Sequence, residues 1–210
     1  MIIVHHLNNS RSQRILWLCE ELGTGYDVRF YERDLTTSLA PAELKAVNPL
    51  GKSPVIEDGD LKIAESGAIV DYLIRTYGSG DFAPAPTTKL HEDYLEWLHF
   101  AEGSAMLPFM LKLYTARLGD AGAPLQPRID EQIASHLTYF DDRLGNHDWL
   151  VGNRLSGADI MMSFVAEIAV ARGAGAACPR LLAYVRRIQS RPAWQAAIAR
   201  GGPYAFTLAE

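Results

Sequence analysis

The chain has 210 residues, 48% of them hydrophobic, and a formal net charge of -5 at pH 7. This length allows one large domain or two small ones with a sizeable core. The negative charge and the dispersed Lys and Arg residues argue against a nucleic-acid partner. No apolar run approaches the roughly 20 residues that span a bilayer, and the first residues lack the order of a secretion signal. We therefore expect no membrane partner and a cytoplasmic location.

The first 80 residues alternate between strand and helix patterns. Gly23 is predicted to close the first helix, and Asp58-Gly59 is a hairpin signal between two short strands. In chain order we predict a strand over 1–7, a helix over 13–23, a strand over 26–35, a helical turn over 40–49, a strand pair over 53–65 and a helix over 66–78. This order indicates a mixed sheet with helices.

The composition changes after this helix. Segment 78–88 is rich in Gly, Pro, Ser and Thr, which favours an irregular linker. Beyond it strand signals nearly vanish, and we predict helical segments over 90–118, 128–145, 157–173, 179–191 and 192–200. The sequence therefore predicts a first domain over 1–80, a linker over 81–88 and an all-helical domain over 89–210.

The stretch "LSGADI" predicts where one buried helix begins. Ser156 is expected at the N-cap with Asp159 three residues later, and Leu155 and Ile160 occupy the two positions of a hydrophobic staple. Capping explains both polar residues, so we expect them to be structural.

Two strand-to-helix junctions in the first domain carry polar side chains. In "NNSRSQR", helix amides point at whatever lies beyond the helix start, a place that favours an anion. Ser10 or Ser12 could cap this helix or donate a hydrogen bond to a thiolate or carboxylate. In "ESG", Ser66 could cap the next helix or bind a carboxylate, and Glu65 could receive an ammonium.

A proline stands just before the predicted strand at Val55. Pro54 could be trans and simply begin an edge strand, where proline is tolerated. It could also be cis, at a cost of ~0.5 to 1 kcal/mol, and turn the backbone of Val55 toward a neighbouring peptide. The residues alone leave both alternatives open.

Taken together and in this order, these places resemble the glutathione transferase superfamily over essentially the full chain. The most specific pieces are "NPLGKSPVIEDGDLKIAES" and "LNNSRSQRILWLCEEL", together with the "LSGADI" capping box. The resemblance implies an α/β plus all-α fold: a thioredoxin-like N-terminal domain followed by an all-helical C-terminal domain. It also implies glutathione as co-substrate and no metal.

The resemblance implies roles for five residues in holding glutathione. Pro54 matches the cis proline of the family, and Val55 would pair its backbone with the cysteinyl part, as an added strand does at a sheet edge. Glu65 and Ser66 match the residues that hold the γ-glutamyl ammonium and carboxylate. Lys52 falls where many members contact the glycyl end.

Family members activate the thiol with a tyrosine, serine or cysteine of the first loop. Neither a tyrosine nor a cysteine occurs between His5 and Arg14. The resemblance therefore implies Ser10 as the activating residue, with Asn9 as the alternative if the alignment shifts by one position. Cys19 lies in the apolar stripe of the first helix and is expected to be a buried core residue. The other cysteine, Cys178, is far from it, and reduced thiols fit both.

The second domain would supply the pocket for a hydrophobic electrophile. The stretch "AMLPFMLKLYTARL" contributes Met106, Phe109, Met110, Leu113 and Tyr114, which could instead be ordinary core or dimer residues. The preceding helix carries Tyr94, Trp97 and Phe100, which could equally supply a subunit interface. The family is usually dimeric, and the resemblance implies a homodimer.

The expected function is that of a glutathione transferase with a detoxifying or catabolic duty. Its glutathione thiolate would attack an electrophile bound beside it. The alternatives are a non-catalytic protein of the same fold that binds a ligand or a protein partner, and a side activity of glutathione-dependent peroxidase.

Overall fold

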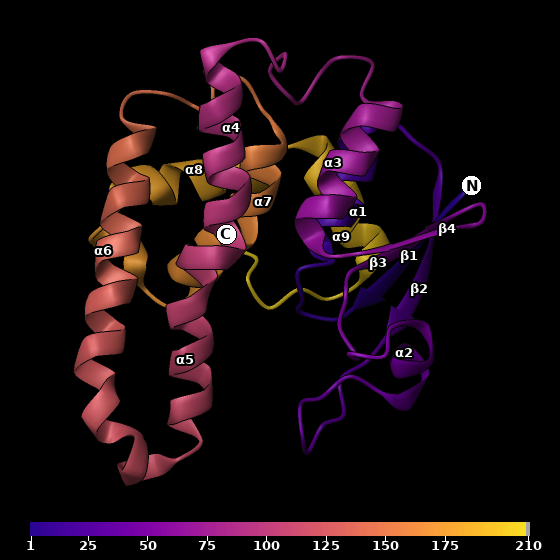
Figure 1. Cartoon of the computed structure of the whole chain (residues 1–210). Coiled ribbons are helices and arrows are strands. Elements are labelled where there is room, and N and C mark those ends of the chain that lie inside the picture. The colour runs from indigo at the N-terminus through magenta and orange to yellow at the C-terminus, as the bar shows by residue number, and fades with distance from the viewer. Residues whose placement is uncertain (209–210) are drawn as a thin grey trace.

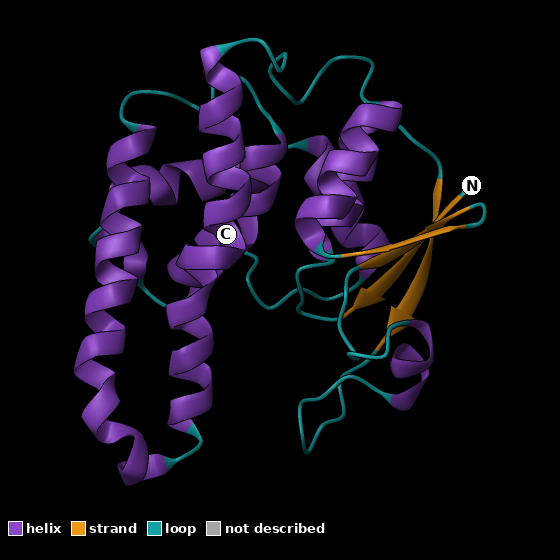
Figure 2. Cartoon of the chain, in the orientation of Figure 1, coloured by secondary structure: helices purple, strands orange, loops and turns teal. Residues whose placement is uncertain are grey.

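The computed structural model describes residues 1–208, and its first part is a small sheet with helices (Figure 1). This part contains β1(Ile2–Leu7), α1(Gln13–Leu22), β2(Tyr26–Tyr31), α2(Ala42–Val47), β3(Val55–Asp58), β4(Leu61–Ala64) and α3(Ser66–Tyr77). Figure 2 shows that the strands gather at one side of the molecule and that helices form the rest. The predicted β-α-β-α-β-β-α order is thus confirmed.

The second part is helical. It contains α4(Lys89–Phe100), the π-helical turn η1(Ala101–Ala105), α5(Met106–Ala116), the 3-10 helix η2(Gly119–Leu125), α6(Gln126–Leu144), α7(Gly157–Ala171), the 3-10 helix η3(Ala174–Ala176), α8(Pro179–Gln189) and α9(Pro192–Gly201). Residues 78–88 connect α3 to α4 without helix or strand. Figure 1 shows α4 and α5 as one long helical rod with α6 beside it.

The four strands form a mixed sheet in the order β2-β1-β3-β4. β1 runs parallel to β2, with Ile2 opposite Tyr26, and antiparallel to β3, with Val4 opposite Ile56. β3 and β4 are antiparallel. β3 is therefore an inner strand of the sheet.

The hairpin turn falls one residue later than predicted. Asp58 still pairs with Leu61 across the ladder, so the two turn residues are Gly59 and Asp60 and not Asp58-Gly59. Gly59 has a φ of 59°, which a residue without Cβ adopts easily. The glycine signal was correct, but its place in the turn depends on the strand register.

Helix α1 is enclosed on nearly all sides. Residues 13–19 are all buried, because α1 packs against β1, α3, α7 and α9. Cys19 is completely buried and free, as expected, and burial raises the pKa of its thiol to about 12. Gly23 ends the helix in the left-handed conformation, as predicted. The enclosed helix fixes the loop before it, which carries Ser10.

Helix α7 begins with the predicted capping box. The backbone N–H and the hydroxyl of Ser156 donate to the Asp159 carboxylate at 2.9 and 3.0 Å. Asp159 also accepts hydrogen bonds from the Leu150 N–H and the Tyr184 hydroxyl. Burial raises the pKa of Asp159 to about 6, although these hydrogen bonds oppose the shift.

The aromatic residues proposed for a subunit interface are mostly core residues. Tyr94 is 1% exposed and Trp97 is completely buried, so neither is available to a second copy. Phe100 is half-buried against Trp97 and Tyr139. The apolar period of α4 indicated a buried face, but only the packing against α7 shows that this face is internal.

Candidate functional site

A cavity of about 490 Å³ lies between the loops of the sheet domain and the helices α5 and α7. The first loop contributes Asn9, Ser10 and Arg11, and the segment before the cis proline contributes Lys52 and Ser53. The predicted thiol-activating residues and one predicted glutathione-binding residue therefore line the same space.

Ser10 is held in place by the start of α1. Its side chain is 5% exposed and lines the cavity. The Oγ atom of Ser10 accepts a hydrogen bond from the Ser12 N–H at 3.2 Å and lies 2.7 Å from the Ser12 Oγ atom. Ser12 is the N-cap residue of α1, just before the first helical residue.

A polar chain continues from Ser12 into the protein. The Ser12 Oγ atom lies 2.9 Å from Nδ1 of His6 and accepts a hydrogen bond from the Leu7 N–H at 3.2 Å. Burial lowers the pKa of His6 to about 4, so the imidazole is neutral near pH 7. His6, Ser12 and Ser10 thus form a continuous chain of neutral hydrogen-bonding groups that ends at the cavity.

Asn9 ties the first loop to the C-terminal segment. Its backbone is left-handed, with a φ of 49°, a conformation that asparagine tolerates better than most residues. Its Oδ1 atom accepts a hydrogen bond from the Ala205 N–H at 2.8 Å. The amide NH2 of Asn9 is therefore the end of the side chain that can donate to a ligand.

The loop before β3 is fastened to β1. The Ser53 hydroxyl donates to the His5 carbonyl at 2.8 Å, and the Asn48 amide donates to the Lys52 carbonyl at 3.0 Å. The bond between Ser53 and Pro54 is cis, which decides between the two alternatives left open by the sequence. The Lys52 side chain is exposed and lines the cavity.

The analogy with an added strand places Val55 at a lateral edge of the sheet, but the structure does not. Val55 pairs in register with His5 of β1 and Ala64 of β4, because β3 is an inner strand. Its place is at the beginning of β3, directly after Pro54. A peptide that pairs with Val55 would therefore approach the beginning of the strand and not its side.

Glu65 and Ser66 stand at the start of α3. Glu65, not Ser66, holds the N-cap position, and Ser66 is the first helical residue, buried to 4% exposure. Glu65 is exposed and has a φ of 71°, an uncommon conformation for a residue with a side chain, and such residues concentrate at functional sites. Pro54, Val55, Glu65 and Ser66 are not among the residues that line the cavity.

All five residues predicted for the electrophile pocket line the cavity: Met106, Phe109, Met110, Leu113 and Tyr114. Met106 and Phe109 are nearly buried, whereas Leu113 and Tyr114 are 40% and 50% exposed. The methionine at one end of the α5 face is thus part of the core, and the other end is open to a ligand.

Sequence reasoning missed the contribution of α7 and of the C-terminal segment. Phe164 and Ile168 of α7 and Phe206 of the C-terminal segment also line the cavity. The apolar run of α7 gave no signal for this, because a buried helix and a pocket wall have the same composition.

A partly buried ion cluster, also missed, joins the first loop to the helical domain. Glu102 of η1 accepts hydrogen bonds from Nε of Arg11 at 2.7 Å and from Nη1 of Arg14 at 2.5 Å. Burial opposes ionisation of Glu102, but the two arginines outweigh it and lower the pKa of the carboxyl. Both guanidinium groups also lie within 6 Å of the Phe164 ring.

Six cationic side chains line the cavity: Arg11, Arg33, Lys45, Lys52, Arg117 and Arg172. None of the lining residues within 1–208 is Asp or Glu. Of the six, only Lys52 was predicted as a site residue. Arg117 falls on the same helical period as Met106, Met110 and Tyr114, and this spacing was the one sequence signal that could have found it.

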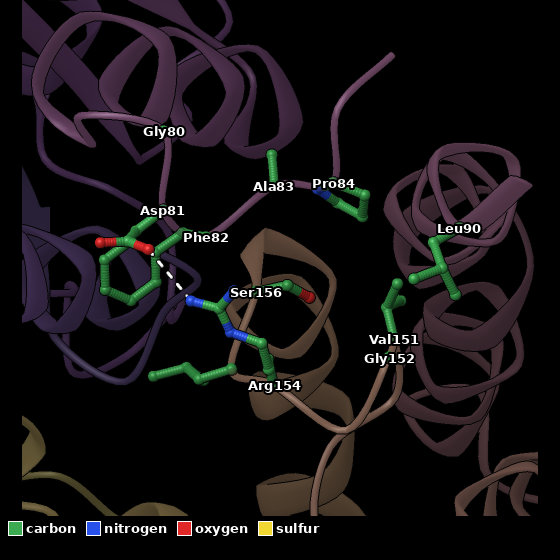
Figure 3. A pocket seen from close by; sticks show the side chains of 11 residues that line it. Gly80, Asp81, Phe82, Ala83, Pro84, Leu90, Val151, Gly152, Arg154 and Ser156 are labelled. Atoms are coloured by element: carbon green, nitrogen blue, oxygen red, sulfur yellow. Dashed lines mark hydrogen bonds and ion pairs between the residues drawn. The ribbon is translucent and has the colours of Figure 1, made fainter. Parts of the chain in front are cut away.

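A second cavity, of about 120 Å³, lies where the segment between α3 and α4 meets the loop before α7 (Figure 3). Asp81 and Arg154 form an ion pair at 3.1 Å beside it, and the Gly157 N–H donates to the Phe82 carbonyl. Figure 3 shows Leu90 and Val151 on the opposite side. None of the predicted site residues lines this second cavity.

Within residues 1–208, no group of His, Cys, Asp and Glu side chains is placed to hold a metal ion. No helix in the same part of the chain is long and apolar enough to cross a membrane.

Comparisons with known proteins agree with this geometry. The family model for the glutathione S-transferase N-terminal domain matches residues 1–75, and that for the C-terminal domain matches residues 100–192. Glutathione S-transferase 3 of Schizosaccharomyces pombe is 33% identical over 179 residues, which cover 78% of this chain and 72% of that protein.

Solved structures give the same result. A glutathione S-transferase from Actinobacillus pleuropneumoniae is 34% identical and has a TM-score of 0.87, with 96% of this chain and 93% of that chain covered. A sphingomonad glutathione S-transferase, solved in complex with glutathione, is 25% identical with a TM-score of 0.80, covering 95% and 98%. The chain therefore belongs to the glutathione S-transferase family and is an enzyme of the glutathione transferase type.

Proposed function

We propose that the chain binds glutathione at this site and that Ser10 activates its thiol for attack on a hydrophobic electrophile. The observation that supports the proposal most is the position of Ser10, which lines one cavity together with the apolar residues of α5. A thiol with a pKa of ~8.5 is only a few per cent ionised at pH 7, so a hydroxyl that donates to sulfur increases the reactive fraction.

The environment of Ser10 favours this role. The positive end of the α1 dipole stabilises a thiolate beside it. The Ser10 Oγ atom accepts the Ser12 N–H and contacts the Ser12 hydroxyl, which can donate to it. When Ser12 donates, the proton of Ser10 is available for the glutathione sulfur. The sulfur then forms the new bond to the electrophilic carbon while the leaving group departs with its electron pair.

The remaining parts of glutathione are assigned to the start of β3 and of α3. Lys52 would take the glycyl carboxylate, Val55 the cysteinyl backbone, and Glu65 with Ser66 the γ-glutamyl end. The exposed, left-handed Glu65 next to the helix start supports this assignment. Val55, Glu65 and Ser66 lie outside the cavity. Glutathione would therefore extend from the cavity toward α3 and leave the α5 side to the electrophile.

The test compares Ser10→Ala with Asn9→Ala. Loss of a donor to a developing anion costs about 10²-fold in rate, so Ser10→Ala should lower kcat/KM by about that factor with an electrophilic arene. Calorimetry should show nearly unchanged affinity for glutathione, and the thiolate absorbance in the complex should appear only at higher pH. Normal turnover by Ser10→Ala would assign the activation to Asn9 or to a backbone amide.

A homodimer and a detoxifying duty are also proposed, on the family membership alone. The residues of the interface would differ from those expected, because Tyr94 and Trp97 are buried within the chain. Sedimentation equilibrium distinguishes a dimer from a monomer.

A further inference from the structure

The cavity carries a positive charge that the rest of the chain does not share. Six lysine and arginine side chains line it, and no acidic side chain within residues 1–208 does so. The chain as a whole has a formal net charge of -5. Positive charge is therefore concentrated at this site in an otherwise acidic protein, as expected where a site attracts anions.

Most of these cations have no carboxylate partner. Arg11 pairs with Glu102, and Arg33 donates to the carbonyls of Asn8 and Ser38. The others are Lys45, Lys52, Arg117 and Arg172, and within residues 1–208 no carboxylate lies within 4.0 Å of their charged groups. Their charge is thus available to a bound molecule.

Glutathione accounts for only part of this charge. This step rests on the proposed function, in which the glycyl carboxylate meets Lys52 and the γ-glutamyl end lies outside the cavity. One carboxylate then faces the cavity cations, and the two arginines that follow α5 and α7, Arg117 and Arg172, remain for the electrophile.

Two arginines lie at the ends of the apolar helix faces. The face of α5 that begins with Met106 and Met110 reaches Arg117, and the face of α7 with Phe164 and Ile168 reaches Arg172. An arginine at a helix C-terminus also interacts favourably with the helix dipole, but that interaction does not require it to line a cavity. Both walls therefore change from apolar to cationic in the same direction along their helices.

We propose that the electrophile is an anion: an apolar, preferably aromatic molecule that carries a carboxylate. Its apolar body would lie against Met110 and Leu113 on the open part of the α5 face, and its carboxylate would meet Arg117 or Arg172. The planar guanidinium group can donate two parallel hydrogen bonds to a carboxylate, which makes arginine the suitable cation for this contact.

The reaction with such a substrate is a balanced aromatic substitution. We take a chloroarene that carries a carboxylate as the example. The glutathione thiolate forms a bond to the ring carbon that bears chlorine, and the carbon–chlorine bond breaks with chloride leaving as the anion. The proton of the thiol passes to solvent, and the substrate carboxylate takes no part in bond changes.

The test uses a matched pair of electrophiles, 4-chloro-3-nitrobenzoate and the neutral 4-chloro-3-nitrobenzamide. The rate with each is divided by its uncatalysed rate with glutathione, so that intrinsic reactivity cancels. The wild type should prefer the benzoate by about tenfold in corrected kcat/KM, the effect of one charged hydrogen-bonded contact. Raised salt should lower this preference, because Arg117 and Arg172 are exposed to solvent.

The variant Arg117→Gln/Arg172→Gln should lose most of this preference. The control Arg128→Gln removes an arginine on α6 that pairs with Glu131 and does not line the cavity, and it should keep the wild-type ratio. The proposal would be overturned if the wild type had the same corrected kcat/KM with both arenes. It would also be overturned if the double substitution left the ratio of the two values unchanged.

A binding measurement separates this proposal from the proposed function. Calorimetry with the unreactive pair 4-nitrobenzoate and 4-nitrobenzamide measures anion preference without turnover. In one outcome neither chloroarene reacts, 4-nitrobenzoate binds about tenfold more tightly than 4-nitrobenzamide, and the double variant loses this difference. The anion site then stands and the proposed function fails. If the chlorobenzamide reacts and neither pair shows a preference, the function stands and the anion site fails.

Discussion

Helices α1 and α7 both begin at a buried serine, but the two helix starts serve different purposes. At α7, Ser156 and Asp159 satisfy each other, and Leu150 and Tyr184 complete the hydrogen bonds of the carboxylate. At α1, the polar chain that includes Ser12 ends at Ser10 beside a cavity. A closed helix start contributes stability, and an open one leaves a donor and a dipole for a ligand.

The largest expected effect is the loss of the closed helix start. Asp159→Ala removes the carboxylate that accepts from four donor groups and leaves only the Tyr184 hydroxyl with another acceptor, the carbonyl of residue 159. We therefore expect the free energy of unfolding to fall by about 4 kcal/mol. Activity per folded molecule should be unchanged, as measured by turnover after correction for the folded fraction. Asp142→Ala, at an exposed position that faces Arg180, is the control and should change stability by less than about 0.5 kcal/mol. A selective loss of turnover at unchanged melting temperature would contradict a purely structural Asp159.

The open helix start should show its own pH dependence through His6. Its folded pKa of about 4 lies below the ordinary value of 6.5, so the folded state binds the proton more weakly than the unfolded state. The contribution of neutral His6 is complete above pH 6.5 and is lost as the pH falls toward 4. This loss amounts to about 3 kcal/mol, at 1.36 kcal/mol for each pKa unit.

Urea unfolding at several pH values measures this contribution. The difference in unfolding free energy between the wild type and His6→Asn should shrink by about that amount between pH 7 and pH 4. His147→Asn, at an exposed position after α6, controls for the loss of a surface histidine. A difference that is constant over this range would show that burial does not hold His6 neutral.

The smallest expected effect distinguishes the two N-cap serines directly. Ser12→Ala and Ser156→Ala should each lower stability by about 1 to 2 kcal/mol, the usual cost of losing a cap or a buried hydrogen bond. Only Ser12→Ala should also lower kcat/KM, by a few-fold, because Ser10 loses the hydroxyl that holds its Oγ atom. Equal kinetics in the two variants would remove the functional difference between the helix starts.

Local sequence patterns predicted most of the fold. Gly23 ends α1 because its left-handed backbone suits glycine, and "LSGADI" begins α7 because its hydrogen bonds are formed within four residues. The errors lie where the register or the packing decides. The hairpin turn moved to Gly59-Asp60, and the N-cap of α3 is Glu65 and not Ser66, although the helix begins at Ser66 as predicted.

For the candidate site, the sequence indicated individual residues but not the contacts between distant segments that bring them together. Ser10, Asn9, Lys52 and all five α5 positions line the cavity. Phe164, Arg172 and the pairing of Glu102 with Arg11 were not predicted, because these contacts join segments that are far apart in the sequence and no local pattern indicates them.

The sequence by itself determined the order of elements, the position of the polar helix starts and the family, since these depend on periodicity, capping and short motifs. Only the tertiary structure decided that the apolar faces of α5 and α7 line the same cavity, and that Asn9 is tied to Ala205 near the other end of the chain. Only the tertiary structure collected six dispersed cations around one cavity. Charge in a sequence is a sum, whereas charge at a site depends on which distant segments the core brings together.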